Sequence, residues 1–516
     1  MFWLARPQPD LSTAPKLRKQ CGSWQVPARR APSLIAPQCF WFLNEAGSLA
    51  ELGWDNPAKA KLWRYNQHYF DDLNAEASEE RLGWHKVLMR KWISANLPGQ
   101  GSGWEPYPTS LRIVNWIKWA LAGNALPEEA IASLAVQTRW LARRLEWHLL
   151  GNHLFSNAKA LIFAGLYFSG KEAQSWLECG LNVLKREISE QIGPDGGQFE
   201  LSPMYHALAL EDMLDLINIA KAFGRKDLVT SWLTHVPLML RWLQVMSHPD
   251  GYLAFFNDTA FGIAPSNTEL SGYARRLDIK TKEIVPALTH LESSGYVRME
   301  VGKFTLLADL AQIGPDYLPG HAHADTLSFE LSWAGHRIFV NSGISEYGTG
   351  PERLRQRGTA AHNTVIIEGH NSSEVWSGFR VGRRAKPLAV TVGVDGSGAQ
   401  FAQAAHNGYR HLPGRPLVTR HFELKKSRLL IIDTISSKAQ CEARFHLHPS
   451  VIVTSITEDC VLLEVPGGQQ LRLLSCSEPL RLEGSTWHPE FGVSIPNYCL
   501  VLPIHAGRAS LSVESK

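Results

Sequence analysis

Two stretches of the sequence place hydrogen-bonding residues where amphipathic helices are expected to begin. In the first, Asn152 and His153 directly precede apolar residues at helical spacing. Asparagine is also a favoured helix N-cap, so a purely structural role for Asn152 is the alternative. In the second, Ser202 can cap a helix and Pro203 fits its first position, which places Tyr205 in the first turn. The partial positive charge at that helix end should favour the phenolate form of Tyr205, although packing against a neighbouring helix would also explain this residue.

A third stretch, residues 321–325, reads His-Ala-His-Ala-Asp and is expected to run directly into a β-strand. Alternation along a strand would place His321, His323 and Asp325 on one face. Polar groups at the edge of a buried face need partners, so this face is expected to bind something. His362 precedes another predicted strand and could lie beside His323. Two imidazoles with one oxygen ligand from an adjacent strand would suit a structural zinc ion.

These residue types suit the removal of a proton from the carbon next to a carboxylate. Such a proton is weakly acidic, and hydrogen bonds from Asn152 and His153 would stabilise the aci-carboxylate that forms when it leaves. Tyr205 or His321 would take the proton, and either could protonate the leaving oxygen. The assignment of base and acid to these two residues is open at this point.

The elements that must position these groups differ between the two halves of the chain. From about residue 83 to 247 the apolar residues recur every three to four positions, which predicts helical hairpins that form a bundle or an α/α toroid. From about residue 297 onward, short β-rich runs follow one another without helices between them, which predicts an antiparallel sandwich. The predicted domains are an N-terminal extension over 1–50, a helical domain over 51–290 and a β-sandwich over 291–516.

The composition of the 516-residue chain is that of a globular protein with little net charge. Lysine and arginine number 52 against 49 acidic residues, and a net charge of +3 is too small to suggest nucleic acid binding. The seven cysteines form no CxxC pair, so free thiols and a reducing compartment are expected. The sequence shows no membrane span and no secretory signal. The expected location is therefore the cytoplasm, with the periplasm or cell envelope as the alternative.

Taken together, four motifs resemble the heparinase II/III-like polysaccharide lyases, and most closely the members linked to bacterial capsule or exopolysaccharide gene clusters. The resemblance extends from about Trp63 to the C-terminal strands. It implies an incomplete (α/α) toroid followed by an antiparallel β-sandwich, and an acidic polysaccharide as substrate. It also implies that Asn152 and His153 neutralise the uronate carboxylate, and that Tyr205 and His321 are partners in proton transfer. The motifs are Gly151-Asn152-His153, residues 199–206, residues 321–325 and Ala361-His362-Asn363-Thr364.

The resemblance also bears on a metal site. His323 and His362 match metal ligands of the family, but Asn341 stands where an aspartate would complete the set. A neutral amide compensates less of the charge of a dication than a carboxylate does. A structural zinc or other divalent cation held by His323, Asn341 and His362 is therefore one expectation, and a hydrogen-bonded His-Asn-His cluster is the other.

Further polar and aromatic residues could bind the sugar chain. Core packing is the alternative for the first group of them, and the second group could face the anionic chain from the sandwich. The first group comprises Trp104, Glu105, Tyr107 and Arg112, and the second Tyr347, Arg353 and Arg357.

Two other functions are consistent with the same predicted fold. A toroid glycoside hydrolase would work with two opposed carboxylates, for which Asp195, Glu200, Asp212 and Asp258 are candidates. A non-catalytic protein of exopolysaccharide binding or assembly would keep the fold without turnover. Elimination is favoured over hydrolysis because the Asn, His and Tyr residues suit it and no carboxylate pair stands out.

Overall fold

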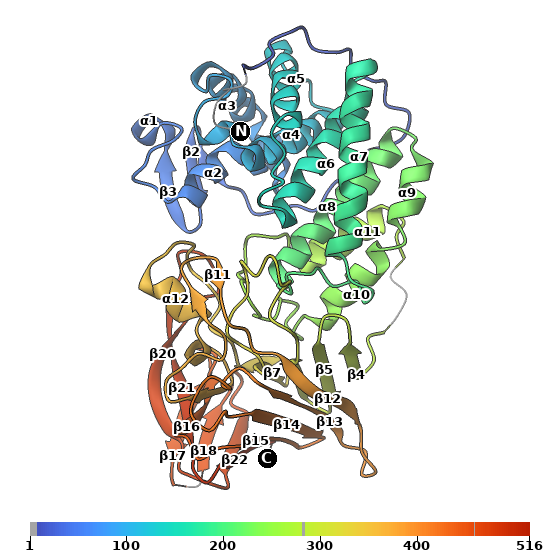
Figure 1. The fold of residues 1–516 in the computed structure, drawn as a ribbon. Coiled ribbons are helices and arrows are strands. Elements are labelled where there is room, and N and C mark those ends of the chain that lie inside the picture. Colours follow the sequence, from blue (N-terminus) through green and yellow to red (C-terminus); the bar gives the residue numbers. More distant parts are fainter. Residues whose placement is uncertain (1–7, 281–283, 459, 516) are drawn as a thin grey trace. The chain divides into compact units, whose positions relative to one another are not determined.

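The computed structural model describes residues 8–280, 284–458 and 460–515, which form two compact units (Figure 1). The first unit contains the chain as far as Ile192, together with Leu208–Pro237 and Ala264–Lys280. The second contains Gly193–Ala207, Leu238–Ile263 and the described chain from Ile284 onward. Two segments of the second unit are therefore separated along the chain from its main part.

The first unit is built from helices, coloured blue to green in Figure 1. A small antiparallel sheet precedes them, formed by β1 (Leu34–Ala36), β2 (Cys39–Phe42) and β3 (Glu45–Ser48). The helices are α1 (Leu49–Leu52), α2 (Lys61–Tyr69), α3 (Leu82–Ala95), α4 (Pro106–Leu121), α5 (Glu128–Ala142), α6 (Gly151–Tyr167), α7 (Lys171–Gln191), α9 (Lys226–Trp232) and α11 (Asn267–Arg276), with single turns η1 (Asp71–Asn74), η2 (Ser78–Arg81) and η3 (Ser102–Trp104). Two further helices, α8 (Pro203–Ala222) and α10 (Val236–Val245), contain residues of both units.

Helices α6 and α7 form a tightly packed hairpin. The apolar residues that predicted α6, among them Leu154 and Leu161, are all buried. Glycines allow the two helix backbones to approach each other. A Cβ on Gly165 would lie 2.6 Å from the backbone N of Leu177, and one on Gly180 would lie 2.8 Å from the carbonyl O of Ala158. A larger residue at either position would force the helices apart.

The described part of the second unit contains three larger antiparallel sheets and one two-stranded sheet, drawn from olive to red in Figure 1. In sheet order, the first comprises β4 (Leu288–Leu291), β5 (Tyr296–Val301), β6 (Phe304–Asp309), β7 (Phe329–Trp333) and β8 (His336–Phe339). The second comprises β12 (Pro387–Val394), β13 (Gln400–His406), β14 (Val418–Lys425), β15 (Arg428–Ile435), β22 (Arg508–Ser515), β19 (Gln470–Ser475), β18 (Cys460–Glu464) and β17 (Ile452–Ile456). The third comprises β20 (Arg481–Trp487), β21 (Ile495–Ile504), β16 (Cys441–His446) and β9 (Val365–Ile367). The short elements are α12 (Pro351–Arg357), η4 (Thr359–Ala361) and the pair β10 (Val375–Trp376) and β11 (Arg380–Val381).

These sheets share one apolar core. Strand β14 alternates strictly between buried and half-buried residues, as expected for a strand with one face in the core. Phe329 packs against Phe422 at 5.4 Å between ring centroids, and Phe339 against Phe445 at 5.6 Å. Residues from all three sheets therefore meet in this core, and the predicted antiparallel sandwich is confirmed.

A buried ion pair joins this core to the loops that carry the predicted site. Arg420 on β14 donates to both oxygens of Asp433 on β15, at 2.7 and 2.8 Å. The same guanidinium donates to the carbonyl oxygens of Leu327 and Asn363, at 3.0 and 2.6 Å. Asn363 directly follows His362, so the sandwich core fixes the backbone on which that histidine stands.

One local prediction is wrong. Residues 321–328 do not begin a strand, because β7 starts only at Phe329. Leu327 has a φ of 64°, a left-handed conformation that interrupts the extended backbone. The simple alternation predicted for His321, His323 and Asp325 therefore does not apply, and their positions follow from a buried loop.

Two expectations from composition can be compared with the described residues. All seven cysteines are free thiols, as predicted. Within the described ranges, every helix is either too short or too polar to cross a lipid bilayer.

Candidate active site

The first unit carries Asn152 and His153 in the opening turn of α6. The N-cap is Leu150, with φ 56° and ψ −153°, an unusual backbone conformation for a residue other than glycine. Asn152 is the second residue of the helix, so its side chain is not needed as a cap. It is half-buried, and its amide makes no hydrogen bond within the described part of the chain. The amide is therefore available to a ligand.

His153 is held by a carboxylate that the sequence did not indicate. Its Nδ1 lies 3.1 Å from Oε1 of Glu146, and its ring lies 4.5 Å from that of Tyr107. Glu146 is buried, and its other oxygen accepts a hydrogen bond from Asn157 at 3.0 Å. An ionised carboxylate can only accept, so the proton of a neutral His153 lies on Nδ1 and Nε2 keeps its lone pair. Glu146 lies in the loop before α6, where no periodic pattern marks it.

Two of the predicted sugar contacts in the first unit are core residues. Trp104 is 2% exposed and donates to the carbonyl oxygen of Asn96 at 3.1 Å. Arg112 is fully buried, donates to Gln137 at 3.0 Å and stacks on Trp92 at 3.7 Å. Core packing, the alternative considered from the sequence, accounts for both positions.

The other two predicted sugar contacts in the first unit reach its surface. Glu105 has 40% of its side chain exposed and pairs with Lys61 at 3.0 Å. It also accepts a short hydrogen bond from the Tyr65 hydroxyl. Tyr107 is half-buried beside His153. A sugar contact for Glu105 and Tyr107 stays a prediction.

The second unit carries Tyr205 in the first turn of α8, as predicted. The Ser202 hydroxyl accepts from the backbone N–H of Tyr205 at 3.2 Å and so caps the helix. The Tyr205 hydroxyl lies 2.9 Å from that of Tyr347, and its ring stacks on His321 at 4.0 Å with a tilt of 30°. Burial, and then the neighbouring Tyr347, raise the pKa of Tyr205 well above that of an ordinary tyrosine. The expectation of a phenolate is therefore wrong for the free protein, in which Tyr205 keeps its proton.

His321 is held by Asp258, a fully buried residue. Nδ1 of His321 lies 2.8 Å from one Asp258 oxygen, and Nε2 of His323 lies 2.8 Å from the other. Arg353 donates to both oxygens. Burial alone would raise the pKa of Asp258, but Arg353 and the hydrogen bonds from the two histidines hold it well below its usual range. Asp258 is therefore an ionised carboxylate that links two predicted site residues.

The predicted arginine contacts of the sandwich lie inside the second unit. Arg353 is fully buried, and besides Asp258 it binds the carbonyl oxygen of Gly378 at 3.0 Å. Arg357 is also fully buried and donates to the carbonyl oxygens of Ala322 and Ser377, at 2.9 and 3.1 Å. Both guanidinium groups therefore hold the loops around His321. A direct contact between either arginine and a substrate stays a prediction.

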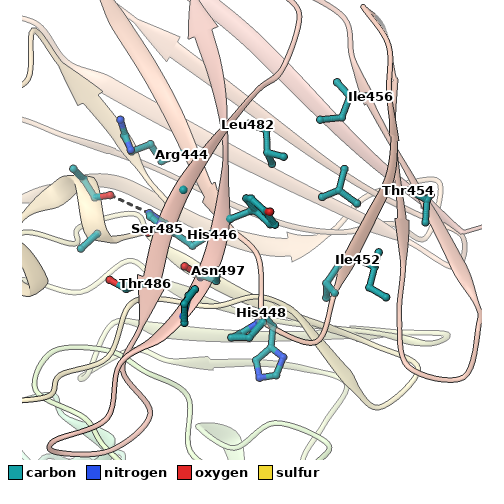
Figure 2. Close-up of a pocket in the computed structure, with 18 of the residues that line it drawn as sticks. Arg444, His446, His448, Ile452, Thr454, Ile456, Leu482, Ser485, Thr486 and Asn497 are labelled. Atoms are coloured by element: carbon teal, nitrogen blue, oxygen red, sulfur yellow. Dashed lines mark hydrogen bonds between the residues drawn. The ribbon is translucent and has the colours of Figure 1, made fainter.

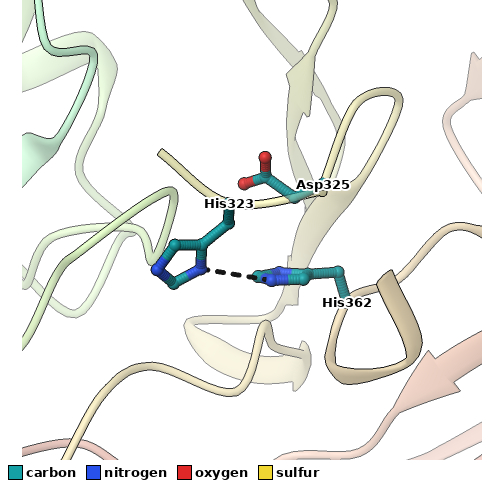
Figure 3. A group of neighbouring side chains, drawn as sticks. All are labelled: His323, Asp325 and His362. Carbon is teal, nitrogen blue, oxygen red and sulfur yellow. Dashed lines mark hydrogen bonds between the residues drawn. The ribbon is translucent and has the colours of Figure 1, made fainter. Parts of the chain in front are cut away.

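His323, Asp325 and His362 form a buried group whose ligand atoms all lie within 4.8 Å of one another (Figure 3). Nδ1 of His323 and Nε2 of His362 are 3.2 Å apart. Burial lowers the pKa of His323 to about 4 and that of His362 well below its usual value, so both imidazoles are neutral at neutral pH. Burial also raises the pKa of Asp325 to about 6. The buried Nδ1 of His362 has no hydrogen-bond partner in the described structure. Two neutral imidazoles and a carboxylate fit the ligand preferences of zinc.

The carboxylate in this group is Asp325 rather than the predicted ligand Asn341. The Asn341 amide donates to the carbonyl oxygen of Phe255 at 2.8 Å, and its oxygen accepts from the backbone N–H of Asn363 at 3.1 Å. Asn341 thus joins two backbone segments beside the histidines. The sequence contained Asp325 in the correct motif, but only the fold shows that its carboxylate approaches His362.

Each of the four carboxylates considered for hydrolysis has a partner within the protein. Two of them bind a backbone N–H or a lysine, and the other two lie beside His321. Asp195 accepts from the backbone N–H of Ser294 at 2.8 Å, and Asp212 pairs with Lys159 at 2.7 Å. Asp258 is occupied as described, and Glu200 lies 3.5 Å from Nε2 of His321. Glu200 and Asp258 therefore flank one histidine, which is not the pair of opposed carboxylates that hydrolysis uses.

The sandwich also carries a hollow of about 1270 Å³ between strands β17, β20 and β21 (Figure 2). Ile452 and Tyr498 on its rim are 58% and 51% exposed. Among the lining residues, His446 contacts the carbonyl oxygen of Ala360 at 3.0 Å, and Arg444 pairs with Glu442 at 2.8 Å. None of the predicted site residues lines this hollow.

Comparisons with known proteins cover most of the chain. A family model described as heparinase II/III N-terminus matches residues 81–274, and one described as heparinase II/III-like, C-terminal matches residues 283–513. A heparin-sulfate lyase of Bacteroides stercoris is 27% identical over 368 residues, which are 66% of this chain and 52% of that protein. One of Bacteroides thetaiotaomicron is 37% identical over 261 residues, 43% of this chain and 37% of that protein. The chain thus spans about half the length, or less, of these relatives.

Solved structures show the same fold. A heparinase III matches with a TM-score of 0.67 at 18% identity, covering 91% of this chain and 82% of its own. A heparan sulfate lyase mutant from Pedobacter heparinus matches with a TM-score of 0.63 at 20% identity, covering 89% of this chain and 78% of its own. The predicted fold, an incomplete (α/α) toroid followed by an antiparallel β-sandwich, is confirmed.

Proposed function

Because the chain belongs to the heparinase II/III-like family, we propose that it is a polysaccharide lyase. Its substrate in this proposal is a uronate-containing acidic polysaccharide, and the reaction is β-elimination. The observation that carries the proposal is the pair of Tyr205 and His321, a phenol stacked at 4.0 Å on an imidazole that a buried carboxylate holds. Such a pair supplies the acid and the base that an elimination requires.

The proposed mechanism assigns both proton transfers to the second unit. His321 removes the proton next to the uronate carboxylate, because its Nδ1 donates to Asp258 and Nε2 keeps a lone pair. The electrons of that C–H bond form the C4–C5 double bond, and the C4–O bond to the next sugar breaks. Tyr205 protonates the departing oxygen, since its raised pKa keeps the phenol protonated. A proton passed from His321 to the Tyr205 phenolate then restores both groups.

Neutralisation of the uronate carboxylate is assigned to the first unit. The Asn152 amide has no internal partner and can donate to a carboxylate oxygen. His153 can donate to a carboxylate oxygen from Nε2 when both ring nitrogens carry protons, with Nδ1 held by the Glu146 carboxylate. Hydrogen bonds that strengthen as negative charge moves onto the carboxylate stabilise the transition state more than the ground state.

A screen of acidic polysaccharides tests the proposal. The purified protein is incubated with polymers of glucuronate, iduronate and mannuronate type and with bacterial exopolysaccharides, and the ultraviolet absorbance of an unsaturated uronate is followed. The expected result is a rise in absorbance on at least one polymer that Tyr205→Phe does not produce. New reducing ends without absorbance would instead indicate a hydrolase. Binding without either signal would indicate a non-catalytic polysaccharide-binding protein.

Glu146→Gln tests how His153 is held. The amide keeps an oxygen that can accept from Asn157 but removes the charge that orients His153. We expect kcat/KM to fall by about 10- to 100-fold, a typical effect of losing the residue that orients a functional histidine. Steady-state absorbance assays measure it, with Glu172→Gln on the surface of α7 as a control of matched chemistry. If Glu146→Gln and the wild-type protein have equal kcat/KM values, Glu146 does not orient a functional histidine.

We further propose that His323, Asp325 and His362 hold a structural divalent cation, such as zinc. When bound, this cation would cross-link the loop at residues 321–328 to the segment that precedes β9. The 3.2 Å separation between Nδ1 of His323 and Nε2 of His362, and the approach of all three ligand atoms to within 4.8 Å of one another, support this assignment. No catalytic step depends on the cation.

Metal analysis and chelation test this assignment. The purified protein should contain close to one equivalent of metal, and His362→Gln should contain none. A chelator should lower the free energy of unfolding by about 2.7 kcal/mol if the free cation had been about 100 times its Kd. His406→Gln is the matched control, because His406 is a fully buried histidine of β13 outside the group. Retained metal in His362→Gln, or a chelator effect that His362→Gln does not abolish, would contradict the assignment.

A further inference from the structure

We propose that Asp258 is the positioning residue of the acid-base pair, which fixes the proton of His321 on Nδ1 and so leaves Nε2 to act on the substrate. This inference rests on the proposed function and adds a residue to it. From the sequence, Asp258 was a candidate only for hydrolysis, where it would have contacted substrate. In the structure, the Asp258 carboxylate instead contacts the side chains of His321 and His323.

The Asp258 carboxylate is a shared acceptor with no capacity left for substrate. One oxygen accepts from Nδ1 of His321 and the other from Nε2 of His323, each at 2.8 Å. Arg353 donates to both oxygens and is itself fixed by the carbonyl oxygen of Gly378. Because an ionised carboxylate only accepts, both histidines must present N–H groups to it. Glu200 lies farther from the other ring nitrogen of His321, at 3.5 Å from Nε2, so the closer Asp258 carboxylate sets the tautomer of His321.

The backbone around Asp258 also positions the Tyr205 side of the pair. The Asp258 N–H donates to the carbonyl oxygen of His321 at 3.0 Å. The Asp258 carbonyl oxygen accepts from the Ser202 hydroxyl at 2.6 Å, and this same hydroxyl caps α8, the helix that carries Tyr205 in its first turn. One residue thus contacts the loop of the base and the helix cap of the acid.

The preceding residue, Asn257, strengthens this arrangement. Its φ is 54°, a left-handed conformation that asparagine tolerates better than most residues. Its amide nitrogen donates to the carbonyl oxygen of Leu201 at 2.9 Å, and its amide oxygen accepts from the N–H of His323 at 3.0 Å. The Asn257–Asp258 turn therefore joins the segment before α8 to both histidines, which is more than an isolated Arg–Asp ion pair would require.

The first test reads the tautomer directly and needs no turnover. Histidine ring nitrogens are labelled with ¹⁵N in the protein as purified, and the signals of His321 are assigned by their loss in His321→Gln. At a single mildly alkaline pH, wild-type His321 should carry its proton on Nδ1. In Asp258→Asn, the amide can donate to a ring nitrogen, so we expect a substantial population with the proton on Nε2. A wild-type His321 protonated on Nε2 would overturn the proposal without any variant.

The second test separates positioning from stability. Asp258→Asn should lower kcat by about 100-fold or more, with KM within about 3-fold of wild type, by analogy with the loss of the orienting aspartate in a Ser-His-Asp triad. Asp72→Asn is the matched control, because Asp72 is also buried, accepts two hydrogen bonds from one arginine, Arg81, and contacts a histidine, His85, outside the site. We expect Asp72→Asn to melt at a lower temperature while its kcat stays within about 3-fold of wild type.

Failure of the proposed function and failure of the role proposed for Asp258 would give different results. If wild type eliminates no polymer, the proposed function fails while the tautomer measurement still decides the role of Asp258. If wild type is active and Asp258→Asn keeps its kcat, the proposal is overturned. The proposal is also overturned if Asp72→Asn loses as much kcat as Asp258→Asn. Should Asp258→Asn fail to fold, Arg353→Lys keeps the positive charge but loses the two-pronged contact, and the expected result is a smaller fall in kcat with KM retained.

Discussion

Tyr205→Phe should lower kcat for elimination by about 100- to 10,000-fold, the usual range for the loss of a general acid or base. The phenylalanine ring preserves the stacking on His321 at 4.0 Å and removes only the hydroxyl. Because this hydroxyl protonates the departing sugar oxygen in the proposed mechanism, the C–O bond would have to break without an acid. KM should change little, since the ring remains. Initial rates from ultraviolet absorbance over a range of substrate concentrations measure both constants.

Tyr347→Phe is the matched control for this prediction. It removes the other hydroxyl of the pair, which lies 2.9 Å from that of Tyr205, and leaves Tyr205 itself unchanged. We expect kcat to fall by no more than about 10-fold, because one neutral hydrogen bond contributes about 1 kcal/mol. If the two variants lose activity equally, the hydroxyls act as a unit and Tyr205 alone cannot be assigned as the acid. If Tyr205→Phe keeps wild-type kcat, the proposed mechanism is wrong.

The parts of the site that could be predicted from the sequence are those set by neighbouring residues. Ser202, Pro203 and Tyr205 stand at fixed offsets from a helix start, and capping preferences apply at those offsets in any fold. The sandwich strands were predictable for a similar reason. Alternation in β14 reflects a local period of two, which the sequence displays directly.

The parts that could not be predicted depend on contacts across long stretches of chain. Asp258 meets His321 across 63 residues and Arg353 across 95, and no spacing rule connects such positions. Glu146 and Asp325 lie in loops, where side-chain direction follows from tertiary packing. The loop at residues 321–328 was mistaken for a strand because buried loops and buried strands have similar composition. The left-handed Leu327 that ends the alternation gives no signal, since leucine rarely adopts this conformation.

Tyr205 is not a phenolate, because the effect of the helix dipole on its pKa is smaller than the effect of burial. The helix dipole alone would lower the pKa of a tyrosine in the first turn, but its effect amounts to about 0.3 to 1 kcal/mol at exposed sites. Burial of the phenol and contact with Tyr347 raise the pKa, and their combined effect is larger than that of the helix dipole. The first turn of α8 therefore positions Tyr205 without ionising it, which suits an acid better than a base.

Asp215→Ala should lower the free energy of unfolding by about 3 to 5 kcal/mol, as expected when one member of a buried charge cluster is removed. One Asp215 oxygen accepts from Lys118 at 2.9 Å and from Lys159 at 2.7 Å, and the other accepts from the Tyr273 hydroxyl at 2.9 Å. The carboxylate thus joins α4, α6, α8 and α11 in the first unit. Its loss would leave two buried ammonium groups with too little compensating charge. Urea unfolding followed by circular dichroism measures the change.

Asp227→Ala is the control for Asp215→Ala, because Asp227 pairs with Arg225 at 2.6 Å with both side chains partly exposed. An exposed pair of this kind contributes less than about 1 kcal/mol. Equal losses in the two variants would contradict the view that burial makes the Asp215 cluster important.

The contribution of Asp215 should also depend on pH in a defined direction. Burial alone would raise its pKa, but Lys118 and Lys159 lower it to about 2, below the value of about 3.9 for an unfolded chain. A carboxyl group whose pKa falls on folding stabilises the folded state above the unfolded pKa and loses this effect as pH falls through the folded pKa. The gap in unfolding free energy between wild type and Asp215→Asn should therefore be constant from neutral pH to about pH 5 and narrow as the pH falls further. A gap that stays constant down to the acid transition would show that the two lysines do not stabilise the ionised form of Asp215.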